Sequence, residues 1–234
     1  PWVLHCATHG FFHGAQEPSL SRKQRGLGGP GVEPSAIRHP EFVNPLFHSG
    51  LALAGANTAS AGGALPAEAE DGLLTAADVS GLDLQGTELV VLAACSTGLG
   101  AVRTGEGVFG LRRTFALAGA KTLVMSLWDV PDLATTILMV EFYHNLLTRK
   151  FPRDEALQAA KRFTREVTVG QLRDHWLTPA MIEQLAAEDE GLRHTLEALA
   201  QRPDDARPFA QPWFWGAFIC QGEPDPLRPF KRQV

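Results

Sequence analysis

The sequence feature that most constrains the fold is segment 88–100, ELVVLAACSTGLG. Its first half, residues 89–94, is a continuous apolar run with β-branched residues, typical of a strand buried on both faces of a sheet. Cys95 follows directly and is succeeded by small, turn-forming residues. In open α/β sheets, ligands bind at this end of the strands. The segment therefore predicts a central strand that carries a cysteine at its functional end.

A histidine near the start of the chain is a candidate partner for this cysteine. Residues 2–8 form a second short apolar strand candidate, which ends at His9 and Gly10. If the two strands are parallel neighbours, His9 and Cys95 come together as a Cys–His dyad. A base close to Cys95 would make it a nucleophile, because only the thiolate attacks. The alternative is that Cys95 is a small hydrophobic residue of the core.

Composition argues against several classes of protein. The chain has 234 residues, of which 44% are hydrophobic, enough for one domain with a sizeable core or one domain with an insertion. The net charge is −5, and the basic cluster at 22–25 is short, which argues against direct nucleic-acid binding. No apolar run approaches the roughly 20 residues that cross a bilayer, and no signal peptide is visible. We expect a cytoplasmic protein that does not bind membranes.

The cysteines and the first residue add two expectations. Cys6, Cys95 and Cys220 each lie in or at the edge of an apolar segment. Their odd number and strand settings argue against a disulfide framework and for a reducing compartment. The chain begins at Pro1 and enters a strand almost at once, so we expect a fragment or processed product that lacks earlier strands of its sheet.

Two irregular segments interrupt the first half of the chain. Residues 13–48 are rich in glycine, proline and charge, which predicts a long loop that could border a substrate groove. A short strand is predicted at 49–55 and a mobile, Ala/Gly-rich loop at 57–71. Residues 73–79 read as a strand end that runs into a short helix capped by Thr75.

After Cys95, helices and strands alternate. A helix from residue 105 is expected to end at Gly119 as its C′ glycine. A buried strand is predicted at 122–128, followed by two helices with Asp132 and Asp154 as N-caps. The alternation implies an α/β fold with a mainly parallel central sheet and helices on both faces.

The last third of the chain has a different character. Residues 168–205 are polar and rich in glutamate, and we interpret them as an inserted helical pair, with Pro179 starting one helix. The aromatic stretch 212–220 predicts a last or edge strand of the sheet. Residues 223–234 form a proline-rich tail that we expect to be loosely ordered.

Six motifs stand out along the chain. They are ATHGFF around His9, SGLAL at 49–53, LLTAADV from residue 73, LAACSTG around Cys95, GEGVFGLRRTFALAGAKTLVMSLWDVPD at 105–132, and PWFWGAFICQG at 212–222. In this order and spacing they resemble the CHAT family of caspase-like cysteine peptidases, which is related to caspases, separases and gingipains. The resemblance implies a caspase–haemoglobinase-like α/β domain over residues 1–222. The family occurs in many bacterial proteins beside repeat or sensor regions.

The resemblance also implies roles for individual residues. His9 would be the general base and Cys95 the nucleophile of peptide hydrolysis. By analogy with the clan, the backbone N–H groups of Gly10 and Cys95 would stabilise the oxyanion.

Substrate specificity rests on a weaker part of the resemblance. In separases, an aspartate in a motif like that at 127–132 helps to hold a basic P1 residue, so Asp129 is the first candidate for substrate binding and Asp132 the second. Asp132 also fits as a helix cap. Metacaspases place an aspartate two residues before the cysteine, where this chain has Ala93, which argues against a strongly basic preference.

Other patterns do not predict a metal or a cofactor. His5, His9 and His13 have a spacing that suits metal ligands on a helix, but residues 3–8 read as a strand. The glycines around residue 107 are not preceded directly by a strand and are not followed by a Lys-Ser/Thr pair, so they do not form a phosphate loop.

Three functions from different classes follow. The favoured one is an endopeptidase that cuts a partner protein under the control of a sensor region or partner outside this chain, since both His9 and Cys95 are present. The second is a catalytically silent interaction or signalling module. The third is another thiol hydrolase or an acyltransferase, which would need a small-molecule pocket.

Overall fold

The computed structural model describes residues 1–12, 46, 49–95, 106–187 and 189–229. The predicted loop at 13–48 therefore lies almost entirely outside the described residues. The chain divides into two compact units. The sheet unit contains Pro1–Asp129, Phe218–Glu223 and the residues from Arg228, and the helical unit contains Val130–Ala217 and Pro224–Leu227.

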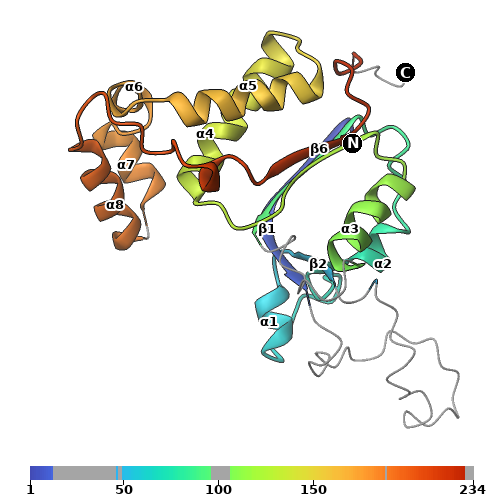
Figure 1. The fold of residues 1–234 in the computed structure, drawn as a ribbon. Coiled ribbons are helices and arrows are strands. Elements are labelled where there is room, and N and C mark those ends of the chain that lie inside the picture. The colour runs from blue at the N-terminus through green and yellow to red at the C-terminus, as the bar shows by residue number, and fades with distance from the viewer. Residues whose placement is uncertain (13–45, 47–48, 96–105, 188, 230–234) are drawn as a thin grey trace, which may run out of the picture. The chain divides into compact units, whose positions relative to one another are not determined.

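The sheet unit contains one mixed sheet of six strands in the order β3-β2-β1-β4-β5-β6 (Figure 1). The strands are β1 (Val3–Phe12), β2 (Ser49–Ala52), β3 (Leu73–Thr75), β4 (Leu89–Cys95), β5 (Thr122–Ser126) and β6 (Phe218–Gly222). Strands β1, β4 and β5 are parallel neighbours, whereas the three remaining pairings are antiparallel.

The prediction of a mainly parallel sheet is thus correct only for the three central strands. Parallel neighbours need a crossover connection of a dozen or more residues, usually a helix. Between β2 and β3 the only helix is the five-residue α1 (Ala56–Ser60), and these two strands pair antiparallel. Helix α1 also shows that the loop predicted at 57–71 is partly helical.

Strand β4 is the buried centre that its sequence predicts. Leu89, Val90, Val91 and Leu92 are all 0% exposed. This burial on both faces explains why the segment is continuously apolar and does not alternate with polar residues.

Two helices cover one face of the sheet (Figure 1). They are α2 (Ala76–Val79) and α3 (Glu106–Leu117). Between them and the sheet lies the core cluster, which consists of Leu51, Ala76, Val79, Leu84, Val90, Leu92, Leu111, Phe115, Ala118, Leu123 and Met125. Leu4 and Cys6 of β1 pack against the core cluster. Because side chains alternate along a strand, His5, Ala7 and His9 lie on the opposite face of β1.

Two predicted helix ends are confirmed. Thr75 caps α2 through a reciprocal pair of bonds: its Oγ1 accepts from the N–H of Asp78 at 3.2 Å, and the carboxylate of Asp78 accepts from the N–H of Thr75 at 3.0 Å. Gly119, just after α3, has φ 108°, a conformation that favours glycine. A Cβ at this position would lie 2.7 Å from the backbone nitrogen of Gln85, so the chain also needs glycine for close approach.

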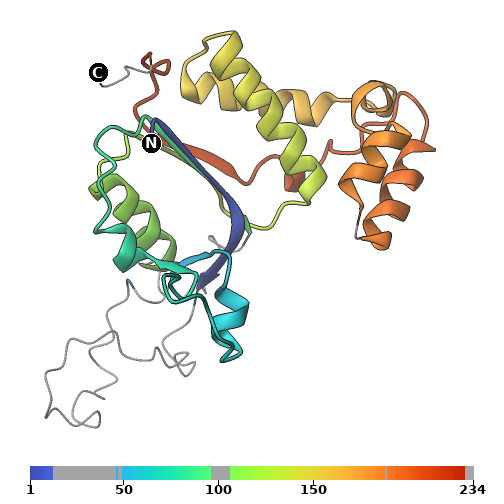
Figure 2. The ribbon, with the colours of Figure 1, turned by 180° about the vertical axis from the view of Figure 1, so that it is seen from behind.

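The helical unit contains more helices than the sequence predicts. Its elements are α4 (Asp132–Tyr143), the π-helical turn η4 (His144–Thr148), α5 (Arg153–Glu166), α6 (Val169–His175), α7 (Pro179–Leu185), α8 (Glu190–Ala200) and the 3₁₀ turn η5 (Pro212–Phe214). Helices α6–α8, drawn in orange, gather into one group in Figure 2. The predicted insertion is therefore three helices and not a pair, because Thr168 forms a capping box with Gln171 and starts α6 before Pro179 starts α7.

Both predicted aspartate caps in the helical unit are wrong. The N-cap residues are Pro131 for α4 and Pro152 for α5, and neither offers a side-chain hydrogen bond. Asp132 and Asp154 instead lie within the first turns, where a negative charge favours the helix dipole. Each proline has its φ fixed by its ring and immediately precedes the helix, so the N-cap lies one residue (α4) or two residues (α5) upstream of the expected cap.

The C-terminal segment also differs from its prediction. Residues 212–214 form η5, and the strand begins only at Phe218, because the N–H groups of Trp215 and Gly216 donate back to Pro212 O and not to a neighbouring strand. In the expected loose tail, Glu223 N–H donates to Lys121 O at 3.0 Å, and Arg228 O accepts from Trp2 Nε1 at 3.1 Å. Among the described residues, no helix is long and apolar enough to span a membrane.

Candidate functional site

The candidate site lies at the carboxyl ends of the parallel strands. Strands β1 and β4 pair in register from Val3 opposite Leu89 to His9 opposite Cys95. Adjacent strands of a sheet lie about 4.8 Å apart, so the two backbones run side by side at this level. The condition set by the sequence, that the two strands be parallel neighbours, is met, and the histidine and cysteine positions share one register level.

His9 belongs to two ladders at once. It is the register partner of Cys95 on β4 and of Ala52 on β2, where β2 ends. Its side chain is exposed and lies on the face of β1 opposite the core cluster. An imidazole in this place is open to a substrate while its backbone is held on both sides.

Gly10, the predicted oxyanion donor beside Cys95, follows His9 in β1 and is opposite Leu51. A glycine lets another main chain approach closely because it has no Cβ. The role of its N–H group stays a prediction, as does that of the N–H of Cys95.

The two candidate specificity aspartates belong to different units. Asp129 is exposed and is the last residue of the first chain segment of the sheet unit. Strands β4 and β5 pair as far as Leu92 opposite Met125; Cys95 lies three residues beyond Leu92, and Asp129 lies four beyond Met125. Asp129 therefore follows a strand that ends at the same edge of the sheet as β4. Asp132 is the exposed first residue of α4 in the helical unit.

Burial distinguishes Cys6 from a reactive cysteine. Cys6 packs against the core cluster, and burial raises the pKa of its thiol above the ordinary value. A raised pKa lowers the thiolate fraction at neutral pH, so Cys6 is a poor nucleophile. Partial burial lowers the pKa of His5, which favours its neutral form.

The described residues contain no group of three or more His, Cys, Asp or Glu side chains that could hold a metal ion. His5 and His9 are four residues apart on the extended strand β1, not on a helix. His13, the third member of the spacing noted in the sequence, lies outside the described residues.

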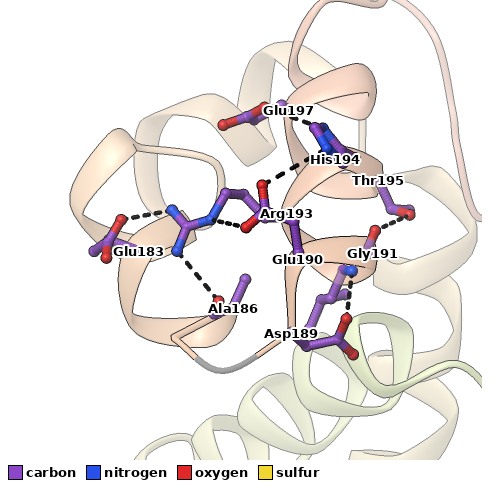
Figure 3. A network of polar contacts seen from close by, with 10 residues as sticks. Glu183, Ala186, Asp189, Glu190, Gly191, Arg193, His194, Thr195 and Glu197 are labelled. Carbon is purple, nitrogen blue, oxygen red and sulfur yellow. Dashed lines mark hydrogen bonds and ion pairs between the residues drawn. The ribbon is translucent and has the colours of Figure 1, made fainter.

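Sequence reasoning missed a polar network that joins α7 to α8 (Figure 3). Arg193 Nη1 contacts Glu183 Oε2 at 2.5 Å, and its Nη2 donates to Ala186 O at 3.3 Å. The guanidinium holds the pKa of the Glu183 carboxyl below its usual range. Asp189 caps α8 by accepting from Leu192 N–H at 2.9 Å. The only signal in the sequence is the Glu190–Arg193 spacing of three, which suits an ion pair on a helix, here 3.4 Å long.

Beside this network lies an open groove of about 1070 Å³. Its lining residues are Arg173, Leu177, Thr178, Pro179, Ile182, Glu183, Arg193, His194, Glu197, Ala198, Ala200 and Gln201. Arg173 is engaged with Asp204 and with the main-chain oxygens of Ala200 and Arg202. Arg173 and Arg193 thus tie neighbouring segments together, and the lining of the groove contains no cysteine.

The fold defines the class of this protein: an α/β domain with a mixed six-stranded sheet, consistent with the caspase-like fold. The family follows from its sequence model. The CHAT domain model matches residues 1–223, nearly the whole chain, and the chain belongs to the CHAT family, a member of the caspase-like peptidase clan.

Among curated proteins, the chain is similar to Tetratricopeptide repeat protein 28 of Homo sapiens, with 44% identity over 75 residues. The protein of the same name from Mus musculus is 41% identical over 75 residues. Each match covers 32% of this chain and only 3% of the relative, so the chain corresponds to a small part of those proteins. No solved structure matches the chain.

Proposed function

We propose that this domain is a cysteine endopeptidase that hydrolyses peptide bonds of a partner protein. The observation that carries the proposal is the register of β1 and β4, in which His9 is opposite Cys95 at the carboxyl ends of parallel strands. Membership of the CHAT family supports it, because the clan of that family contains peptidases with this pair of residues.

The proposed reaction has two halves. In the first, Cys95 Sγ attacks the carbonyl carbon of the peptide bond, and the imidazole of His9 takes the thiol proton and passes it to the departing amine. The product of this half is a thioester between Cys95 and the acyl part of the substrate. In the second, a water molecule gives a proton to His9 and attacks the thioester carbon, the C–S bond breaks to release the carboxylic acid product, and the proton returns from His9 to the cysteine sulfur.

Both halves develop negative charge on the substrate oxygen. Fixed N–H donors stabilise that charge more than the neutral carbonyl, so they lower the barrier. The proposed donors are the N–H groups of Gly10 and Cys95. Gly10 directly follows the proposed base His9, and Cys95 is itself the proposed nucleophile.

Asp129 is the proposed specificity residue. It is exposed and follows β5, whose neighbour β4 ends at Cys95. A carboxylate at this edge would attract a lysine or arginine side chain at the P1 position of the substrate. Asp132, at the start of α4, is the second candidate.

Control by a repeat region outside this chain is part of the proposal. The curated relatives are named for tetratricopeptide repeats, and the chain matches only a small part of each. A repeat region in the same protein or in a partner would present the substrate or hold the domain inactive until a signal arrives.

The test is cleavage of a positional-scanning peptide library by the intact parent protein. Cys95→Ala and His9→Ala are each expected to lower kcat/KM by about 10³-fold or more, because each removes a reacting group. Cys220→Ala and His175→Ala are the matched controls and are expected to cleave normally, since neither position lies at the paired strand ends. Asp129→Ala is expected to weaken a preference for basic P1 residues.

The other outcomes identify the competing functions. Cleavage that survives both Cys95→Ala and His9→Ala contradicts the peptidase proposal. Absence of cleavage by the wild-type protein with its repeat region present favours a silent signalling module. Turnover of thioesters without turnover of peptides favours another thiol hydrolase or an acyltransferase.

A further inference from the structure

Thr8, the residue before His9, makes a polar contact that the proposed mechanism does not use. Its hydroxyl Oγ1 donates a hydrogen bond to the main-chain oxygen of Ala52. Ala52 is the register partner of His9 on β2. The contact therefore ties β1 to β2 at the level of the proposed general base.

Several residues around the Thr8–Ala52 contact are small. Ala7 and Gly10 flank the Thr8–His9 pair in β1, and Gly50 and Ala52 belong to the facing strand. A Cβ on Gly50 would lie 2.5 Å from Leu74 O, so β2 and β3 approach too closely for a larger residue at this position. Leu51 packs β2 into the core cluster, and the Thr8 hydrogen bond adds a fixed contact at the last residue of that strand.

The ladder between β1 and β2 also ends at this level. Strand β2 finishes at Ala52, and the next N–H, that of Leu53, donates to Gly72 O at 2.6 Å. The Thr8 hydroxyl thus reaches the last residue of β2, where strand ends would otherwise separate most easily.

We propose that Thr8 is a positioning residue for His9. It holds β1 against β2, and so keeps the backbone of His9 at the register level of Cys95. Side chains alternate along β1, so Thr8 and His9 lie on opposite faces and Thr8 acts through the main chain. This inference rests on the proposed peptidase function.

A small displacement at this position has a large expected effect. When a catalytic group is held in an attacking geometry, a shift of about 1 Å costs on the order of 100-fold in rate. Loss of the Thr8 hydroxyl does not remove a reacting group, so we expect part of this loss and not the whole of it.

The chain offers a matched control at the other end of β1, where β1 pairs with β4. Thr87 Oγ1 donates to Pro1 O at 2.7 Å, just before β4 and β1 begin. Thr87→Val and Thr8→Val each remove one threonine hydroxyl that donates to a main-chain oxygen, and each keeps a β-branched side chain. The two variants differ in the strand that the lost bond ties to the β1 segment, β2 or β4, and in their distance from His9.

The experiment compares Thr8→Val, Thr8→Ser and Thr87→Val in the intact parent protein. Its readouts are kcat and KM for peptide cleavage, the pH profile of kcat/KM, and the rate of Cys95 alkylation by iodoacetamide from about pH 5 to about pH 9, which spans the ordinary pKa values of histidine and cysteine. Thr8→Val is expected to lower kcat by about 10- to 100-fold with KM within about twofold. It is also expected to shift the pH profile and to slow alkylation at neutral pH.

The remaining variants decide between positioning and general destabilisation. Thr8→Ser keeps the donor and is expected to retain kcat within about threefold, whereas Thr87→Val is expected to lower thermal stability but leave kcat within about twofold. Equal kcat in Thr8→Val and Thr87→Val, or no rescue by serine, overturns the inference while the peptidase function stands. If His9→Ala leaves both cleavage and the alkylation profile unchanged, the proposed function fails first, and the role of Thr8 fails with it.

Discussion

The two ends of the central strands are built differently. At the amino ends, Thr87, Glu88 and Lys121 are all engaged: Thr87 donates to Pro1 O, the N–H of Glu88 donates to Trp2 O, and Lys121 forms an ion pair with Glu88. At the carboxyl ends, His9 and Asp129 are exposed.

This difference indicates a division of roles along one sheet. The amino ends bury polar groups, and buried polar groups that have partners make a structure costly to open. The carboxyl ends present polar groups to solvent, as expected where a ligand binds in an α/β sheet. Substitutions at the amino ends should therefore change stability more than chemistry, and substitutions at the carboxyl ends should do the reverse.

The largest stability effect is expected for Lys121→Met. The Glu88 side chain is 6% exposed, and the substitution would leave its carboxylate buried without its cation. Breaking such a pair from one side costs about 3 kcal/mol of unfolding free energy, measurable by urea denaturation. The double variant Lys121→Met/Glu88→Gln is the control and should recover part of the loss. A loss below about 1 kcal/mol would show that the amino ends are no more stabilising than an exposed ion pair.

A smaller effect is expected for His5, which lies between the two ends, opposite Val91. Its folded-state pKa is lowered by burial, so the folded state resists protonation more than the unfolded state does. The stabilisation is therefore present above the ordinary pKa of 6.5 and is lost as the pH falls through the folded-state pKa. Urea midpoints of the wild type should fall more on acidification than those of His5→Gln. Parallel pH curves for the two proteins would contradict this expectation.

The smallest stability effect is expected for His9→Ala. The side chain is exposed and lies away from the core cluster, and such substitutions change the unfolding free energy by less than about 0.5 kcal/mol. Thermal unfolding of this variant should thus match that of the wild type, although its cleavage activity is expected to be lost. A large drop in Tm would mean that the carboxyl ends also stabilise the fold. That result would contradict the division of roles between the two ends.

The sequence predicts well what short segments determine. The continuous apolar run at Leu89–Cys95 specifies β4, Thr75 specifies the start of α2, and Gly119 marks the end of α3. These features depend on burial, on a side chain that bonds the backbone three residues further on, and on a backbone angle, all of which act within a few residues.

Strand direction and exact helix starts were less predictable. The antiparallel pairing of β2, β3 and β6 depends on partners distant in sequence, which local patterns do not encode. At α4 and α5 a proline and an aspartate compete as start signals, and the proline takes the N-cap position, one or two residues before the aspartate. At the candidate site, the register of His9 and Cys95 follows from a correct choice of neighbouring strands, whereas the bond from Thr8 to Ala52 needed the position of β2.

The pairing of β1 with β4 also affects how the domain is made. His9 and Cys95 lie 86 positions apart, and no ladder between their strands can form until both segments have been synthesised. Pairings of such long range give a high contact order, which slows folding because a large loop must close first. A growing chain on the ribosome therefore carries His9 without its register partner until the next 86 residues have been synthesised, and the candidate site cannot form before then.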